Sequence, residues 1–319
     1  MKRGAFIILW FMLGISLAKS QSDSRISLGY PVFSQYLQNG LMINPAYTGT
    51  RGALSTFLSY RKQWLGVKGS PDIKSLSLHT PMKNDRVGLG FIGQFMTYGY
   101  THATSVYATY AYNVRIGSGK LSLGLKGGFD RSNSDYSNIR LSTAGDPVFM
   151  TTDKPYMLPN VSAGAYYYDS RFFLGFAVPA FLSYNRTGSG GVQAYHSFNN
   201  YDLMFSGGAL ISFSEFFRFK PSVLVDYSMD KAIGIKQLDV NGNIILADLI
   251  WIGGSWRTTE EVAVGILQVQ VNTQLMFGFS YDYPVGRKDY LSKGFNGSTE
   301  FILRYEFGYK VSASNPRYF

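Results

Sequence analysis

The residue types that most often carry out chemistry are sparse in this sequence. Its three histidines, His79, His102 and His196, lie far apart without the spacing of metal ligands, and the chain has no cysteine. We interpret each of the three as an ordinary histidine of a strand or loop and not as a metal ligand. No ordered set of serine, histidine and acid, as hydrolases use, can be assembled. We therefore expect no catalytic residue, no metal and no cofactor.

Two short motifs resemble chemical sites without meeting their requirements. The stretch from Val114 to Leu121 is similar to a phosphate-binding loop, but it lacks the first glycine and has Leu121 where a serine or threonine must bind magnesium. We interpret it as a hairpin turn. Glu260 and Glu261 follow two threonines in a short turn, where solvated acids are ordinary. The sequence predicts that this protein is not an enzyme.

The clearest structural pattern lies between residues 273 and 309. Apolar or aromatic residues occupy alternate positions from Leu275 to Tyr283 and again from Phe301 to Tyr309. Because successive side chains of a strand point to opposite faces, each segment has one apolar wall and one polar wall. The apolar wall covers roughly ten residues, as a tilted strand across a bilayer does. The other wall carries acids and an arginine, which a packed core rarely accepts. This pattern is typical of transmembrane β-barrel strands.

Similar segments recur along the chain, with no internal repeat and no separate soluble domain. We predict an all-β fold, a transmembrane antiparallel β-barrel of about 14 strands. Residues 131–159 and 183–200 break the pattern and are predicted to be loops. The predicted strands cover residues 53–61, 73–80, 86–95, 103–115, 120–130, 160–168, 172–179, 201–213, 217–227, 233–246, 250–257, 261–271, 274–283 and 300–309.

The N-terminus has the features of a secretory signal peptide. Lys2 and Arg3 precede an apolar run from Ala5 to Ala18 that is too short to span a membrane as a helix. We expect cleavage after Ala18 or Ser20, and the lack of cysteine argues against a lipoprotein anchor. The predicted organisation is a signal peptide (residues 1–20), a periplasmic or lumenal leader (21–50) that could act as a plug, and a barrel (51–319).

Composition places this exported chain in the bacterial outer membrane. No run after Ala18 reaches the ~20 apolar residues of a spanning helix, and in a bilayer only helices and closed barrels satisfy every backbone polar group. The net charge is +10, or +7 once Lys2, Arg3 and Lys19 are removed. No cluster of basic residues accompanies it, so we expect the lipid bilayer and not nucleic acid as the partner.

A set of short motifs resembles one family over essentially the whole mature chain. In order, the motifs are Phe33–Leu37, Ile43–Gly52, Tyr60–Gly66, Gly69–Pro71, Leu76–Pro81, Val87–Gly90, Tyr110–Tyr112, Lys120–Gly124, Gly145–Phe149, Gly278–Tyr283 and Gly297–Glu300. Together they resemble the PorP/SprF family of Bacteroidetes outer-membrane proteins, which is associated with the type IX secretion system and gliding motility. One departure is Thr299, where the family pattern Gly-Ser-His-Glu has histidine.

The resemblance implies a non-enzymatic barrel that supports secretion, cell-surface attachment or both. The implied partner is a secreted surface protein with a type B C-terminal domain, together with other type IX components such as periplasmic ring or peptidoglycan-linked proteins. The alternative is a porin or a channel for hydrophobic substrates, which needs an open lumen. A barrel hydrolase is disfavoured because the catalytic set is missing.

Two groups of residues are candidates for lumenal or partner contacts. One polar wall of the last two strands should face the lumen, where it could form ion pairs, hold a plug or bind a partner segment, and on this basis Ser280→Lys should be tolerated. The leader and the first hairpin carry the residues that the family resemblance singles out, although the Arg-x-Gln-Trp set could equally anchor the barrel at the interface. The candidates are Asn44, Pro45, Tyr47, Arg61, Trp64, Gln274, Ser280, Asp282, Glu300, Arg304 and Glu306.

Overall fold

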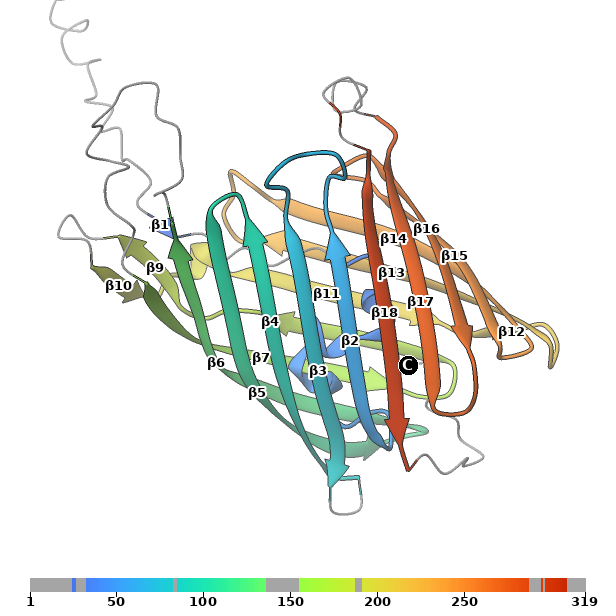
Figure 1. Cartoon of the computed structure of the whole chain (residues 1–319). Coiled ribbons are helices and arrows are strands. Elements are labelled where there is room, and N and C mark those ends of the chain that lie inside the picture. Colours follow the sequence, from blue (N-terminus) through green and yellow to red (C-terminus); the bar gives the residue numbers. More distant parts are fainter. Residues whose placement is uncertain are drawn as a thin grey trace, which may run out of the picture.

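The structure is a computed structural model that describes residues 25–26, 33–82, 85–135, 155–186, 191–286, 294 and 296–308. Fourteen antiparallel strands form a closed barrel, as the alternation predicts (Figure 1). Barrel strands that follow one another in sequence pair with one another, and the first strand pairs with the last. β8 pairs with β11 although two short strands lie between them in the sequence, and β11 in turn pairs with β13. The barrel strands are β2 (Leu54–Lys62), β3 (Asp72–Met82), β4 (Val87–Tyr98), β5 (Thr101–Ile116), β6 (Gly119–Ser134), β7 (Tyr156–Tyr168), β8 (Phe172–Val178), β11 (Asp202–Ala209), β13 (Phe217–Ser228), β14 (Ile235–Leu246), β15 (Ile250–Arg257), β16 (Val262–Gln270), β17 (Leu275–Pro284) and β18 (Ser298–Phe307).

The barrel closes where β2 meets β18. Leu54 lies opposite Phe307 and Lys62 opposite Thr299, so the first and last strands pair over their whole common length. Closure leaves no unpaired strand edge within the membrane, where an exposed backbone group would cost several kcal/mol. Among the described residues, no helix is both long enough and apolar enough to cross a membrane.

The predicted loop at residues 131–159 is too long at both ends. β6 continues to Ser134 and β7 begins at Tyr156, and residues 136–154 lie outside the described part of the chain. The prediction failed because Arg131, Ser132, Asn133 and Ser134 give neither face an apolar side chain. Hydrogen bonds between strands hold this end of the hairpin, and these do not require a hydrophobic wall.

The predicted loop at residues 183–200 is also partly wrong. It contains β9 (Ser183–Arg186), β10 (Val192–Tyr195) and the 3₁₀ turn η4 (Phe198–Asn200). β9 pairs on one side with β10 and on the other with β1 (Arg25–Ile26), which forms a three-stranded sheet. Sequence reasoning missed this sheet because its strands have only two to four residues, and β9 contains the turn-forming Ser183 and Asn185. β12 (Ile211–Ser212) is a two-residue continuation of β11 that pairs with β13, and it is not counted as a separate barrel strand.

The two ends of the barrel differ in the length of their connections. The long connections, at residues 63–71, 135–155, 179–201 and 285–297, all leave from one end, the long-loop end. The other end, the short-turn end, has connections such as residues 117–118, 169–171 and 271–274 and receives the end of β18. Outer-membrane barrels keep short turns in the periplasm and longer loops outside. The long-loop end therefore faces the cell exterior.

The distribution of side chains is the reverse of that in a soluble protein. Phe277, Phe301 and Leu125 are among the large apolar side chains exposed on the outer face. The largest fully buried side chains include Arg51, Arg61, Arg257, Arg304 and Lys220. This arrangement suits a barrel with lipid outside and a polar interior. The residues inside the barrel are therefore the candidates for a functional site.

Candidate functional site

Residues 33–52, the inner segment, lie inside the ring of strands and connect directly to β2 (Figure 1). They form three 3₁₀ turns, η1 (Tyr36–Gln38), η2 (Gly40–Met42) and η3 (Pro45–Tyr47). The turns follow from Asn39-Gly40, Asn44-Pro45 and Thr48-Gly49, which favour turns and prevent a continuous helix. The inner segment bonds to the wall near Glu300 at one end and near Glu306 at the other. Six strand residues separate these two, about 20 Å along the barrel.

Ser34 is the hub of a charged network at the long-loop end of the inner segment. Its backbone N–H donates to Glu300 Oε2 at 2.8 Å, and its hydroxyl donates to Asp282 Oδ1 at 2.6 Å. Arg61 donates to the Ser34 hydroxyl at 2.9 Å and pairs with Asp282 at 2.6 Å and Glu300 at 3.3 Å. All four side chains are buried. Three strands and the inner segment thus share one network.

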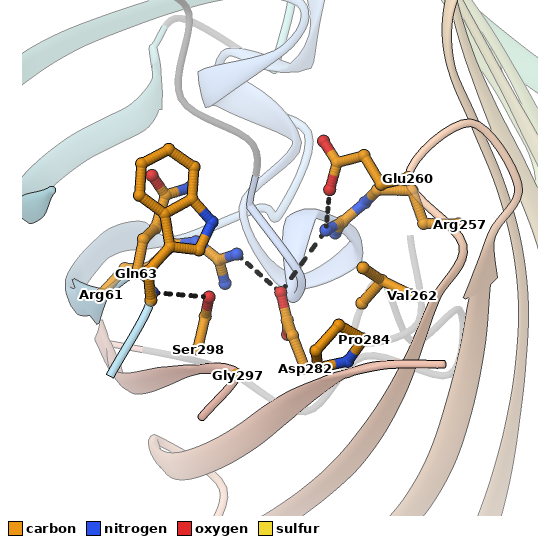
Figure 2. Close-up of a pocket in the computed structure, with 10 residues that line it drawn as sticks. Arg61, Gln63, Arg257, Glu260, Val262, Asp282, Pro284, Gly297 and Ser298 are labelled. Carbon is orange, nitrogen blue, oxygen red and sulfur yellow. Dashed lines mark hydrogen bonds and ion pairs between the residues drawn. The ribbon is translucent and has the colours of Figure 1, made fainter. Parts of the chain in front are cut away.

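Arg257 extends this network across the barrel. It pairs with Asp239 at 3.2 Å, Asp282 at 3.4 Å and Glu260 at 3.2 Å. Figure 2 shows Asp282 joined to both Arg61 and Arg257. Because each buried guanidinium meets more than one carboxylate, the cost of removing these charges from water is offset by several partners.

A second network holds the other end of the inner segment. Arg51 forms an ion pair with Glu306, and it also donates a hydrogen bond to the Tyr47 hydroxyl at 3.4 Å. Arg304 pairs with Glu306 at 3.4 Å and donates to Gln38 Oε1 at 2.5 Å. The inner segment is therefore fixed to β18 through charged groups near both of its ends.

The middle of the inner segment rests on glycines of the barrel wall. The Asn44 side chain accepts from the Ala46 N–H and donates to the carbonyls of Ala165 and Phe176, at 3.0 and 3.2 Å. A Cβ at Gly124 would lie 2.2 Å from Ala46 N, and one at Gly164 would lie 2.1 Å from Asn44 Oδ1. Only glycine allows the wall and η3 to approach this closely.

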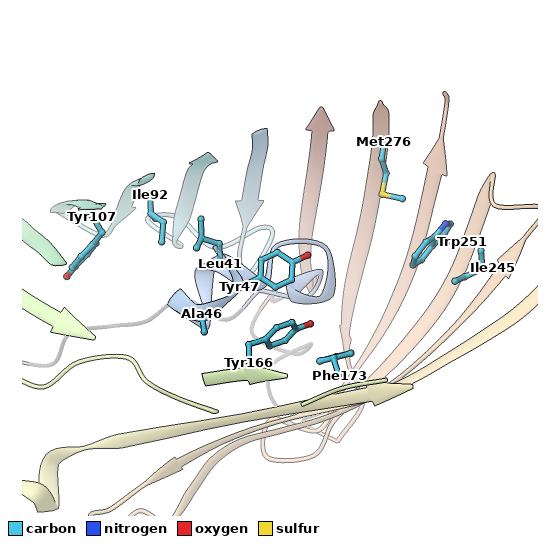
Figure 3. Packing of buried hydrophobic residues seen from close by; sticks show 10 residues of the cluster. All are labelled: Leu41, Ala46, Tyr47, Ile92, Tyr107, Tyr166, Phe173, Ile245, Trp251 and Met276. Carbon is cyan, nitrogen blue, oxygen red and sulfur yellow. The ribbon is translucent and has the colours of Figure 1, made fainter. Parts of the chain in front are cut away.

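Apolar contacts complete this interior (Figure 3). Leu41, Ala46 and Tyr47 of the inner segment form a buried cluster with side chains of β4, β5, β7, β8, β14, β15 and β17. The Tyr47 ring meets the Tyr166 ring edge-on, with centroids 5.5 Å apart. Such pairs contribute about 0.5–1.5 kcal/mol beyond area burial.

The three histidines make packing and hydrogen-bond contacts. His79 Nδ1 accepts from the Gly49 N–H at 3.0 Å, His102 Nδ1 lies 3.2 Å from Thr97 Oγ1, and His196 bonds to the Tyr201 hydroxyl. Within the described part of the chain, no group of three or more His, Asp or Glu residues could hold a metal ion.

The structure places most of the predicted site residues in or around the inner segment. Asn44, Pro45 and Tyr47 belong to that segment, and Ser280, Asp282, Glu300, Arg304 and Glu306 face it from β17 and β18 with Arg61 from β2. Two lie apart. Gln274 is in the β16–β17 turn, where it accepts from the outward-facing Tyr305 hydroxyl, and Trp64 is half-exposed in the β2–β3 connection.

Sequence reasoning missed the partners that complete the two networks. Ser34 and Arg51 lie in the inner segment, which shows no periodicity from which a facing side could be assigned. Asp239 and Arg257 are on the inward faces of β14 and β15. Alternation identifies those faces, but it does not identify which strands meet across the interior.

A cavity of about 230 Å³ opens above the Ser34 network at the long-loop end. We call its buried lining residues Arg61, Arg257 and Asp282 the floor, and its more exposed lining residues Gln63, Trp64 and Glu260 the rim. Figure 2 labels all of these except Trp64. These residues come from β2 and the β2–β3 connection, β15 with its turn to β16, and β17. Gly297 and Ser298 from the start of β18 close one side.

A closed antiparallel barrel with an apolar outer face and a charged interior defines an outer-membrane β-barrel protein. Residues 26–305 match the family described as type IX secretion system membrane protein PorP/SprF, so the chain belongs to the PorP/SprF family and lies in the outer membrane. A comparison with curated proteins found no match.

Solved outer-membrane barrels are similar at low sequence identity. Omp33 of Acinetobacter baumannii has a TM-score of 0.46 and 7% identity, over 81% of this chain and 100% of that one. The CymD monoaromatic hydrocarbon channel has a TM-score of 0.48 and 11% identity, over 90% and 95%. A FadL homologue from Pseudomonas aeruginosa has a TM-score of 0.40 and 12% identity, over 80% and 89%. At this level, the similarity says nothing about substrate.

Proposed function

We propose that this protein is a closed, non-enzymatic barrel of the type IX secretion system. In this role it supports the secretion or surface attachment of a partner protein with a type B C-terminal domain. Membership of the PorP/SprF family supports the link to the secretion system. The partner itself and the gliding or adhesin role are part of the proposal.

The observation that carries the proposal is the inner segment. A diffusion channel needs a continuous aqueous path, whereas here a chain segment occupies the interior, held by a buried ion pair at one end and by hydrogen bonds to buried carboxylates at the other. The Arg51–Glu306 pair and the Ser34 bonds to Asp282 and Glu300 are made by residues that are almost completely buried. Because the inner segment blocks the interior, the surface available to a secreted partner is the long-loop end, on the cell exterior.

The absence of turnover is likewise a proposal. The buried acids and arginines pair with one another, and the histidines contact backbone, threonine or tyrosine groups. Thr97 with His102 and Tyr201 with His196 each join a hydroxyl to an imidazole, but within the described part of the chain no carboxylate completes either pair, as the third member of a catalytic set would.

The test has a genetic arm and an electrical arm. The gene is deleted, and surface display of the protein encoded beside it is measured together with whole-cell uptake of small solutes. We expect loss of display with normal uptake, restored by the wild-type gene. The purified barrel in a planar bilayer should show no steady conductance. Normal display, impaired uptake and a steady conductance would instead support a porin or a hydrophobic-substrate channel.

A further inference from the structure

The cavity at the long-loop end has the chemistry of a binding site for a cation. Two guanidinium groups, Arg61 and Arg257, lie in its floor, but Asp282 pairs with both. Two further carboxylates, Asp239 and Glu300, pair with the same arginines but are not part of the cavity lining. The charged lining, Asp282 and Glu260 with Arg61 and Arg257, is formally neutral. With Asp239 and Glu300 added, the network of ion pairs around the cavity has four carboxylates and two guanidiniums, a formal net charge of −2.

The rim supplies the two groups that a cation can reach from outside. The Glu260 side chain is 46% exposed, and it makes its ion pair with Arg257 at 3.2 Å. The Trp64 side chain is 47% exposed, and tryptophan has the best aromatic face for a cation. Both line the same cavity.

Trp64 is held in an unusual backbone conformation. Its φ is 48°, which is a genuine outlier for a bulky residue. Hydrogen bonds fix it there, because the Trp64 N–H donates to Ser298 Oγ at 3.2 Å and the Leu65 N–H donates to the Gly297 carbonyl at 2.8 Å. Such strain concentrates at ligand clamps and similar sites. The β2–β3 connection therefore presents the indole from a rigid support.

The size of the cavity limits what it can accept. At about 230 Å³ it is smaller than the ~300–1,000 Å³ pockets that enclose whole small molecules. It has room for a single long side chain, and it opens toward the cell exterior, where a secreted protein is encountered.

We propose that this cavity receives one lysine or arginine side chain of the secreted partner, held between the Trp64 ring and the Glu260 carboxylate. The identity of the occupant as part of a secreted protein rests on the proposed function. The chemistry of the cavity does not, because it follows from the charges and the aromatic ring at the rim.

The binding test uses the full barrel in detergent and two probes of nearly equal shape. N-acetyl-arginine amide carries the charge, and N-acetyl-citrulline amide replaces the guanidinium with a neutral urea. We expect the arginine probe to bind at least fivefold more tightly in a titration. Glu260→Gln should weaken its binding about threefold to tenfold. The matched control is Glu261→Gln, which removes the same charge from the next residue of the turn, outside the cavity lining.

A second variant tests the same proposal independently, in case Glu260→Gln disturbs the turn. Trp64→Leu retains an apolar side chain but removes the π face, and it should weaken arginine binding about twofold to tenfold while leaving citrulline binding unchanged. Equal binding of the two probes to wild type, or equal effects of Glu260→Gln and Glu261→Gln, would overturn the proposal.

A cell assay separates this proposal from the proposed function. Glu260→Gln should reduce retention of the neighbouring gene product at the surface, while Glu261→Gln should not. If deletion of the gene abolishes display but Glu260→Gln and Trp64→Leu leave it intact, the cavity is not the docking point and the proposed function stands. If deletion leaves display normal, the proposed function fails whatever the probes show.

Discussion

Gly124→Ala tests whether the close contact between η3 and the barrel wall keeps the interior of the barrel blocked. The added Cβ would lie 2.2 Å from Ala46 N and 2.4 Å from the Pro45 carbonyl carbon. Optimal non-bonded contacts are about 3.5–4.0 Å, so the wall and η3 must separate by roughly 1.3 Å or more. Backbone atoms are on both sides of the contact, so no side chain can rotate away to relieve it.

A separation of this size would break the hydrogen bonds that seat Asn44. Its Nδ2 lies 3.0 Å from the Ala165 carbonyl oxygen and 3.2 Å from that of Phe176, and neither bond survives a further 1.3 Å. At about 0.5–1.5 kcal/mol each, the loss is about 1–3 kcal/mol, the same range as overpacking of a core. We expect Gly124→Ala to lower the free energy of unfolding by about 2 kcal/mol.

The control comes from the same strand. A Cβ at Gly127 meets nothing within 4 Å, so Gly127→Ala should be neutral or slightly stabilising. Unfolding is followed by urea titration of the purified barrel in detergent, and pore opening by conductance in a planar bilayer. The Gly124→Ala barrel should be less stable than wild type and should conduct intermittently, whereas the Gly127→Ala barrel should match wild type in both measurements. If the two variants have equal stability and neither conducts, the account of how η3 packs on the wall is refuted.

Three further predictions concern charge, lipid contact and chain direction. Glu306→Gln should cost about 3 kcal/mol of unfolding free energy, because Arg51 loses its buried carboxylate, whereas Glu215→Gln in an exposed turn should cost less than 0.5 kcal/mol in the same titration. Phe277→Lys puts a charge on the outer face, where the side chain is 49% exposed, and should cost about 2–4 kcal/mol in refolding into bilayers; an unchanged refolding yield would contradict the lipid-facing assignment. An epitope inserted just before Arg25 should be stained on intact cells, since β1 pairs with β9 at the long-loop end; staining only after permeabilisation would reverse the inferred orientation.

The sequence predicts the wall of this barrel well because lipid imposes a simple rule on it. Phe277, Phe279 and Phe301 alternate with inward polar residues, and each is exposed on the outer face. The number of strands follows from the same rule. Prediction fails above the membrane, at the ends of β6 and β7 and in β9 and β10, because water on both faces removes the alternation.

The candidate site was predictable only in part. The inward positions of Ser280, Asp282, Glu300, Arg304 and Glu306 follow from alternation, but their partners do not. The structure also revises the expectation that Ser280→Lys is tolerated. Ser280 is fully buried, and the Gln35 amide lies 3.5 Å from its hydroxyl, so a lysine there would collide with the inner segment. Alternation identifies an inward face but does not distinguish open water from packed chain.

The inner segment is joined to the strand that closes the barrel. It runs without a break into β2, and its Arg51 bonds to β18, the strand with which β2 pairs. The inner segment therefore acts as an intramolecular ligand, with an effective concentration fixed by a short tether and independent of how much protein the cell makes. It cannot diffuse away, and each barrel carries one copy. Any opening of the pore is consequently a local unfolding event within one chain, and it reverses without the need to find a partner again.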